Sequence, residues 1–287
     1  MKYDFELSGG SFLEPFIWEQ ATSLLRISVW EENVPGLKAG FTTRLGGVSA
    51  GPFDSMNCGL HVGDEDKDVV TNRQNLAAKL NFSFNQWTCA EQIHSNRIMI
   101  IGDTERGKGN RSRDDAIQDV DGLVTSLPDV LLTSFYADCV PLFFLAPSKP
   151  VIGIAHAGWK GTASNIGAKM VECFKNDFGI NPVEIKVAIG PSIGGCCYEV
   201  DDKVIKKISL NLTETNSSFY KIKGNGKYQV DLKKANQILI EHAGVPASHI
   251  LSSNWCTSCR NDLFFSHRKE AGKTGRMAAF IGLNREV

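Results

Sequence analysis

The stretch VDGLVTSLPDVLLTSFYADCVPLFFLAPSKPVIGIAHAGWKGT, residues 120–162, forms the apolar centre of the sequence and decides the expected fold. It contains four short runs rich in β-branched and aromatic residues, joined by tight connections, which is typical of buried strands. The expected strands cover residues 120–125, 130–136, 140–146 and 151–155. Such a succession of strands predicts a centre built of β-sheet.

Helical periodicity appears on both sides of this centre. Apolar residues at three- and four-residue spacing predict helices from about residue 66 to 80, from Gly161 to Gly179, and through residue 243 after a capping Asp231. In the last of these helices, His242 is expected to face inward.

Strands come in runs and helices are fewer, so we expect an α+β fold rather than a doubly wound sheet. The remaining segments are read as strands at 184–189 and 277–283, an exposed loop at 103–119, and a loop or hairpin at 211–228. No segment has the composition of an interdomain linker. We therefore expect a single domain over residues 1–287, with an irregular or edge-strand lead-in over residues 1–35.

Composition points to a small-molecule partner. Lys and Arg number 31 against 32 for Asp and Glu, a net charge of −1, which argues against nucleic acid or an anionic membrane as partner. The N-terminus lacks a signal-peptide pattern, and the apolar stretch 130–154 carries Asp138, Lys149 and three prolines, so no membrane span is expected. Eight cysteines could suggest disulfides, but the chain is large and has no secretion signal, so we expect free thiols in a reducing compartment, the cytoplasm.

Three short segments each bring one soft-metal ligand to the end of a strand or turn. These ligands are His94, Cys139 and His156. Two imidazoles and a thiolate form a set that zinc favours, and three protein ligands with a fourth position free is the catalytic pattern. Residue types alone leave the alternative open that these are ordinary buried residues, because sequence spacing does not show that they converge.

Asp138, next to Cys139, is a candidate proton carrier. Neighbouring residues of a strand point to opposite faces, so this role requires a turn or bulge at that position. A carboxylate that merely accepts backbone N–H bonds in a turn is the equally weighted alternative.

Two cations are candidates for binding an anion such as phosphate. Lys160 stands where an apolar strand passes through a glycine turn into an expected helix, whose first N–H groups attract anions. Arg44 lies in a second glycine-containing loop. Simple turn glycines and an exposed loop arginine are the corresponding alternatives.

The cysteines near the C-terminus carry a weaker signal. Cys256 and Cys259 form one C-x₂-C pair without a second pair, so buried or incidental thiols are the favoured interpretation. The glycines at 194–195 suggest a close backbone approach to a ligand or to another strand.

Several ordered motifs together resemble the bacterial laccase-domain family. They are QIH at 92–94, DGLV at 121–124, ADCVPL at 137–142, HAGWKGT at 156–162, GPSIGGCCYE at 190–199 and TGRMA at 274–278. The match extends over about residues 41–279. It departs from the family pattern at Gly195, at His267 and at Cys259, which stands outside that pattern.

This resemblance implies the function. Members of the family were long described as multicopper polyphenol oxidases and are now regarded as purine nucleoside phosphorylases that also deaminate adenosine. The resemblance implies zinc on His94, Cys139 and His156, with Cu²⁺ able to bind the same site, and a layered α/β/β/α fold similar to the cytotoxic necrotizing factor catalytic domain. The implied substrates are phosphate with adenosine, inosine, guanosine or S-methyl-5′-thioadenosine, and we expect a monomer or homodimer.

Two other enzyme classes are weighed against this expectation. A copper polyphenol oxidase needs many imidazoles, and the chain has six histidines in all. A Cys/His hydrolase would use Cys139 as nucleophile and His156 as base, which excludes a metal-bound Cys139.

Overall fold

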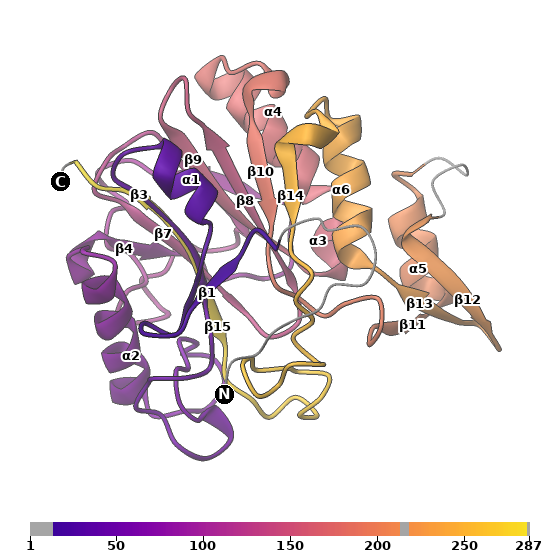
Figure 1. Cartoon of the computed structure of the whole chain (residues 1–287), viewed down its shortest axis with the longest axis horizontal. Helices are drawn as coiled ribbons and strands as arrows, with labels where there is room; N and C mark the ends of the chain where they lie inside the picture. Colours follow the sequence, from indigo (N-terminus) through magenta and orange to yellow (C-terminus); the bar gives the residue numbers. More distant parts are fainter. Residues whose placement is uncertain (1–13, 213–217, 286–287) are drawn as a thin grey trace.

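Two six-stranded mixed sheets form the centre of the computed structural model, which describes residues 14–212 and 218–285 (Figure 1). Both sheets are antiparallel in the middle and have parallel pairs near their edges. The first sheet has the order β1 (Ile17–Glu19), β2 (Leu24–Arg26), β3 (Leu37–Thr42), β15 (Met277–Leu283), β7 (Leu131–Tyr136) and β4 (Trp87–Cys89). The second has the order β14 (Ile250–Ser252), β10 (Lys186–Ile189), β8 (Val140–Ala146), β9 (Val151–Ala157), β6 (Gly122–Thr125) and β5 (Ile98–Ile100).

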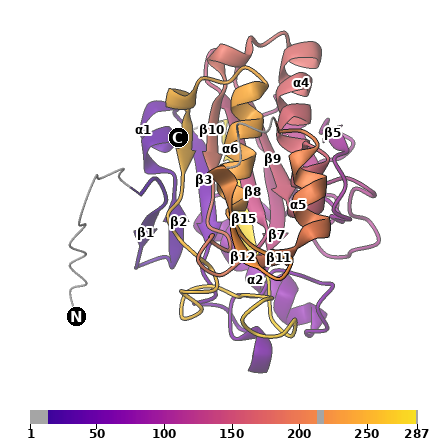
Figure 2. The same cartoon turned by 90° about the vertical axis from the view of Figure 1, so that its right-hand side faces the viewer.

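A small third sheet and six helices of the described residues surround these two sheets. The third sheet is antiparallel, with the order β11 (Glu199–Asp201), β13 (Lys227–Val230) and β12 (Tyr220–Gly224). The helices are α1 (Ser28–Asn33), α2 (Asp66–Lys79), α3 (Trp159–Ala163), α4 (Ile166–Phe178), α5 (Asp202–Ser209) and α6 (Leu232–His242). Figure 2 shows α1 and β1 on one side of the molecule and α4 and α5 on the opposite side.

Apolar side chains divide the structure into layers. One buried cluster, which includes Phe41, Leu132 and Ile154, fills the space between the two large sheets. A second cluster joins α2 to the outer face of the first sheet, and a third joins α4 and α6 to the outer face of the second. The expected α+β class and α/β/β/α layering are confirmed, because each sheet buries one face against the other sheet and one against helices.

The strands expected in the apolar centre are β6 to β9. Every residue of β7, β8 and β9 is buried, which explains their continuous apolar runs. The strand β9 continues to Ala157, so that His156 lies within the sheet rather than after it.

The helix expected from Gly161 to Gly179 is divided into α3 and α4. Asn165 adopts a left-handed conformation with φ +59° and accepts a hydrogen bond from the Ala168 N–H, which starts a new helix. Gly179 ends α4 with φ +63°, as expected.

The helix α6 begins and ends close to the expected positions. The Asp231 carboxylate accepts a hydrogen bond from the Lys234 N–H at 3.0 Å and so caps the helix as predicted. The inward position predicted for His242 is wrong. It is exposed because α6 ends there, beyond the apolar face formed by residues such as Leu239.

Two segments for which the sequence left alternatives open contain strands in their described parts. Residues 14–35 of the lead-in include the edge strand β1 together with β2 and α1, and the segment 211–228 includes β12 and the start of β13, which pair as a hairpin. Residues 1–13 and 213–217 of these segments lie outside the described residues. None of the described helices has both the length and the apolar character needed to cross a membrane.

Candidate metal centre

The side chains of His94, Cys139 and His156 converge from three different parts of the two large sheets. His94 lies in the loop after β4, Cys139 in the turn that joins β7 to β8, and His156 in β9. One ligand atom from each residue lies within 4.8 Å of the others, and the Cys139 Sγ is 4.0 Å from the His94 Nε2. Segments that are distant in the sequence thus meet at one point.

The buried Asp121 carboxylate shapes the loop that carries His94. It accepts hydrogen bonds from the backbone N–H groups of Ile93, His94 and Ser95 at 3.2, 3.0 and 2.7 Å, and from the Ser95 hydroxyl at 2.9 Å. These bonds hold His94 in a left-handed conformation with φ +64°. A non-glycine residue in this region is strained, and the hydrogen bonds to Asp121 compensate for this strain.

The same carboxylate orients His156. The His156 Nδ1 lies 2.8 Å from an Asp121 oxygen, and both side chains are almost fully buried. Burial raises the pKa of Asp121, but the hydrogen bonds from His156 and Ser95 outweigh it and hold this pKa below its usual value. An ionised carboxylate can only accept, so Nδ1 donates to it, which leaves Nε2 as the nitrogen that can bind a metal once it has lost its own proton. A carboxylate behind a histidine is the usual outer partner of a metal-binding imidazole.

Cys139 and His156 also influence each other's protonation in the metal-free protein. Burial raises the pKa of the Cys139 thiol, but the neighbouring His156 and His94 outweigh this effect and lower it to about 6. Burial lowers the pKa of His156, but the Cys139 thiolate and Asp121 raise it to about 9. At neutral pH the thiolate form of Cys139 is therefore favoured, which is the form that binds metals.

A glycine makes room beside the three side chains. A Cβ atom at Gly158 would lie 2.9 Å from the Cys139 Sγ and 2.9 Å from the His94 Cδ2. His94 is exposed, Cys139 is half-buried and His156 is buried, so the group opens to solvent on the His94 side.

This arrangement fits a metal ion with one position left for a ligand. With Zn–N bonds of about 2.0–2.1 Å and a Zn–S bond of about 2.3 Å, tetrahedral coordination separates N and S by about 3.6 Å. The observed 4.0 Å between the Cys139 Sγ and the His94 Nε2 needs only a small side-chain adjustment. The group could therefore hold a metal with three protein ligands.

Asp138 lies in the turn between β7 and β8 with φ +88°, so the turn that a proton-carrying role requires is present. Its carboxylate accepts hydrogen bonds from the Thr257 hydroxyl at 2.6 Å, the Ser266 hydroxyl at 2.8 Å and the Arg268 N–H at 2.7 Å. These contacts connect Asp138 to the segment 257–268. Its role as proton carrier stays a prediction.

The two predicted anion-binding cations have different surroundings. The Arg44 guanidinium donates to the Asp54 and Asn261 carbonyls and to the Glu270 carboxylate, and it lies over the Phe265 ring. Arg44 therefore joins the glycine-containing loop to the segment 261–270, and its assignment to phosphate stays a prediction.

Lys160 is exposed in the first turn of α3, two residues after Gly158. Its Nζ lies 5.9 Å from the centre of the Trp159 ring. Its exposed positive charge is thus close to Gly158 in the sequence, and the assignment of Lys160 to phosphate also stays a prediction.

Sequence reasoning missed two residues beside this group. Asp121 was quoted only as part of a motif, although an acidic residue before a buried strand is a signal for such a partner. Burial lowers the pKa of Arg276, and the nearby Cys139 and Asp138 offset part of this effect. Arg276 directly precedes β15 and was quoted only within the TGRMA motif, and no local pattern places it beside Cys139.

Fold and site together define a protein of two stacked sheets with a His/Cys/His group that could hold a metal, and comparisons with known proteins identify the family. Residues 38–284 match the family described as multi-copper polyphenol oxidoreductase laccase. The chain is 48% identical over 251 residues to the purine nucleoside phosphorylase YlmD of Geobacillus stearothermophilus, covering 88% of this chain and 92% of that protein. It is 43% identical to the Bacillus subtilis protein of the same name, covering 91% and 95%.

Solved structures of similar proteins have the same fold. The crystal structure of YlmD from Geobacillus stearothermophilus superposes with a TM-score of 0.92 at 45% identity, covering 95% of this chain and all of that one (100%). The Bacillus licheniformis protein YfiH gives a TM-score of 0.89 at 44% identity, covering 92% and 97%. The chain belongs to the laccase-domain family, whose close relatives carry the name purine nucleoside phosphorylase.

Proposed function

We propose that this protein is a zinc-dependent purine nucleoside phosphorylase that also deaminates adenosine. The observation that carries the proposal is the convergence of His94, Cys139 and His156 in a chain so similar to proteins named purine nucleoside phosphorylase. The proposed substrates are phosphate with adenosine, inosine, guanosine or S-methyl-5′-thioadenosine. One domain acting as a monomer or homodimer in the cytoplasm remains part of this proposal.

The donor set favours zinc over a redox copper centre. Two imidazole nitrogens and one thiolate with one free position match a catalytic zinc site. A multicopper oxidase needs a further cluster of imidazoles, whereas the possible metal-binding groups among the described residues bring together only two histidines, His94 and His156. Copper can still bind this site, because Cu²⁺ has the higher intrinsic affinity for such ligands. When bound, zinc would act as a Lewis acid at the reacting purine or its leaving group.

The residues around the group suggest how the chain handles a negatively charged co-substrate. Phosphate needs positive charge close to the metal ligands. Arg276 interacts electrostatically with Cys139 and Asp138, and Lys160, two residues after Gly158, is the second proposed cation. Arg276 is held by its own hydrogen bonds to the Thr274 and Gly275 carbonyls, so its guanidinium is already oriented. Asp138 is the proposed carrier of the proton that moves to or from the purine.

A product assay tests the proposal. Metal-quantified protein is incubated with adenosine, with and without phosphate, and adenine and inosine are separated by chromatography. Adenine release that depends on phosphate, together with inosine formation that does not, would support both activities. Cys139→Ala should lose both products, whereas Cys173→Ala, which alters a cysteine in α4 outside the group, should keep them. Absence of both products with a zinc-loaded wild type would refute the nucleoside assignment.

The protonation of Cys139 and His156 supports a second candidate function, that of a Cys/His hydrolase. The lowered pKa of Cys139 and the raised pKa of His156 describe a thiolate–imidazolium pair, which is also the nucleophile and base of a Cys/His hydrolase. Activity that survives complete metal removal and is abolished by thiol alkylation would favour this class. Activity that falls with the metal content would exclude it.

A further inference from the structure

A second group of thiols, separate from the group already described, gathers beside the third sheet. It consists of Cys196 and Cys197, in the turn before β11, and Cys256 and Cys259, in the loop after β14. All four sulfur atoms lie within 4.8 Å of one another, although Cys196 and Cys259 are 63 positions apart in the sequence. The C-x₂-C pair, which has no second pair nearby in the sequence, therefore lies next to Cys196 and Cys197 in the structure.

The distances within this cysteine cluster fit a four-coordinate metal. The Cys259 Sγ lies 3.5 Å from the Cys196 Sγ and 3.4 Å from the Cys197 Sγ. A tetrahedral zinc with four Zn–S bonds of about 2.3 Å places neighbouring sulfurs about 3.8 Å apart. All four cysteines are free thiols, so each sulfur is available as a ligand.

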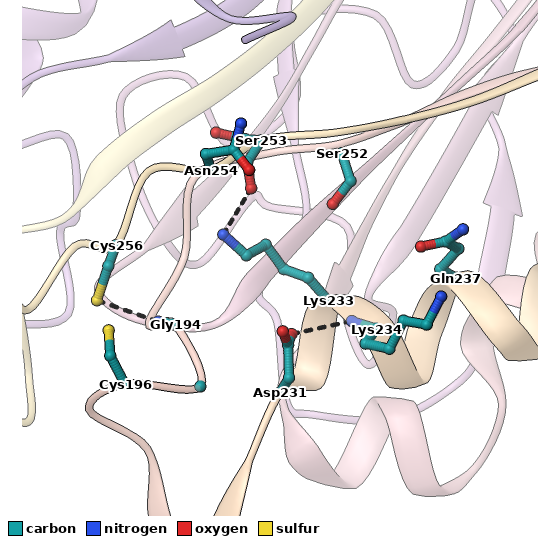
Figure 3. Close-up of a pocket in the computed structure, with 11 residues that line it drawn as sticks. Gly194, Cys196, Asp231, Lys233, Lys234, Gln237, Ser252, Ser253, Asn254 and Cys256 are labelled. Atoms are coloured by element: carbon teal, nitrogen blue, oxygen red, sulfur yellow. Dashed lines mark hydrogen bonds between the residues drawn. The ribbon is translucent and has the colours of Figure 1, made fainter. Parts of the chain in front are cut away.

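The backbone around the cluster supports thiolate ligands. The Gly194 N–H donates to the Cys256 Sγ at 3.1 Å, a contact drawn in Figure 3. A Cβ at Gly194 would lie 3.2 Å from both the Cys196 Sγ and the Cys256 Cβ. A glycine at this position therefore lets the backbone approach the sulfurs closely enough to hydrogen-bond one of them.

The two loops are also fastened to each other independently of the sulfurs. Ser192 and Cys256 form a parallel β-bridge, in which the Thr257 N–H donates to the Ser192 carbonyl. The buried Lys233 donates to the Ser253 and Trp255 carbonyls just before Cys256, and it lines the same pocket of about 260 Å³ as Cys196 and Cys256 (Figure 3). Its positive charge offsets part of the negative charge that four thiolates would place there.

We propose that Cys196, Cys197, Cys256 and Cys259 bind a structural zinc ion. Four protein ligands leave no position for a substrate, so this ion has no catalytic part. Its effect is to hold the loop after β14, and that loop supplies the Thr257 hydroxyl that binds Asp138 next to Cys139. The ion would thus stabilise the segment that supports the His94–Cys139–His156 group without touching that group.

Metal stoichiometry tests this proposal, with no dependence on enzymatic activity. Reduced protein is reconstituted with Zn²⁺, loosely bound metal is removed, and zinc is measured per chain by elemental analysis against sulfur. We expect about two zinc ions in the wild type, about one in Cys259→Ser and about one in Cys139→Ser. Cys173→Ser, which changes a cysteine outside both groups, should keep two.

The identity of the ligands can be read from spectra. Co²⁺ substituted into Cys139→Ser should give the intense visible absorption of a tetrahedral thiolate site, and Cys259→Ser should weaken it. A wild type that binds a single zinc, retained in Cys259→Ser and lost in Cys139→Ser, would overturn the proposal. So would a disulfide among the four cysteines found by mass spectrometry in protein isolated under reducing conditions. If Cys259→Ser fails to fold, Cys139→Ser decides the question: one zinc retained supports the four-cysteine site, and none overturns it.

Discussion

Replacement of Asp121 by asparagine tests whether its carboxylate organises the metal centre. Its two oxygens together accept five hydrogen bonds, from three backbone N–H groups, the Ser95 hydroxyl and the His156 imidazole. Asp121→Asn replaces one oxygen by an NH₂ group, which faces N–H donors in either orientation of the amide. It also removes the negative charge that keeps the proton on the His156 Nδ1.

Two magnitudes follow from this geometry. Loss of an outer carboxylate partner weakens metal binding by about 10- to 100-fold, which is about 1.4–2.7 kcal/mol. Each buried donor left without an acceptor costs about 1–3 kcal/mol of the free energy of unfolding. We therefore expect the variant to bind zinc at least about 10-fold more weakly and to unfold at lower denaturant concentration.

The assay is a Zn²⁺ competition titration with a chromophoric chelator at neutral pH, accompanied by urea unfolding of the metal-free protein. The matched control is Asp119→Asn, because Asp119 lies two residues away, is 57% exposed and pairs only with the exposed Arg97 among the ion pairs of the described chain. An exposed pair of this kind is worth about 0–1 kcal/mol. Equal zinc affinity in Asp121→Asn and Asp119→Asn would refute the proposed role of Asp121.

Three further predictions concern the same centre. Lys160→Ala should raise the KM for phosphate about 10-fold or more and spare deamination, since one charge-assisted contact is worth about 1.5–3 kcal/mol. Steady-state kinetics measure this beside the exposed control Lys169→Ala. A phosphate KM equal to that of the wild type in both variants would contradict the prediction. In metal-free protein, alkylation of Cys139 should follow the thiolate, slow as the pH falls below about 6 and level off above it, because its pKa is about 6; peptide mass spectrometry measures this, and a midpoint near the ordinary thiol pKa would show that the imidazoles do not stabilise the thiolate. Gly158→Ala should lower zinc occupancy, because the new Cβ would lie 2.9 Å from the sulfur of Cys139 and 2.9 Å from His94; full occupancy by elemental analysis would show that the loop yields at little cost.

The amino-acid sequence determined the elements of this fold because their signals are local. Continuous apolar runs separated by tight connections marked the strands expected between residues 120 and 155, and the complete burial of β6 to β9 explains why the runs are not interrupted. The Asp231 cap and the Gly179 terminus were equally readable, since each depends on hydrogen bonds or φ values within one helical turn. His242 was misplaced because periodicity does not show where a helix extends beyond the core.

The residue types of the metal centre were also visible in the sequence, but their convergence was not. Family resemblance selected His94, Cys139 and His156, which the spacing of residues had left open. Only the stacking of the two sheets brings the β4 loop, the β7–β8 turn and β9 together. The carboxylate of Asp121 then contacts the His156 side chain and the backbone N–H of His94.

The cysteine cluster shows the physical limit most directly. In the sequence, Cys256 and Cys259 have no partner pair, because Cys196 and Cys197 are adjacent and about sixty positions away. A metal site depends on distances of a few ångströms, and such distances are set by long-range sheet pairing and loop packing rather than by spacing along the chain. Sequence therefore determined which ligands this protein has, and tertiary structure decided which of them meet.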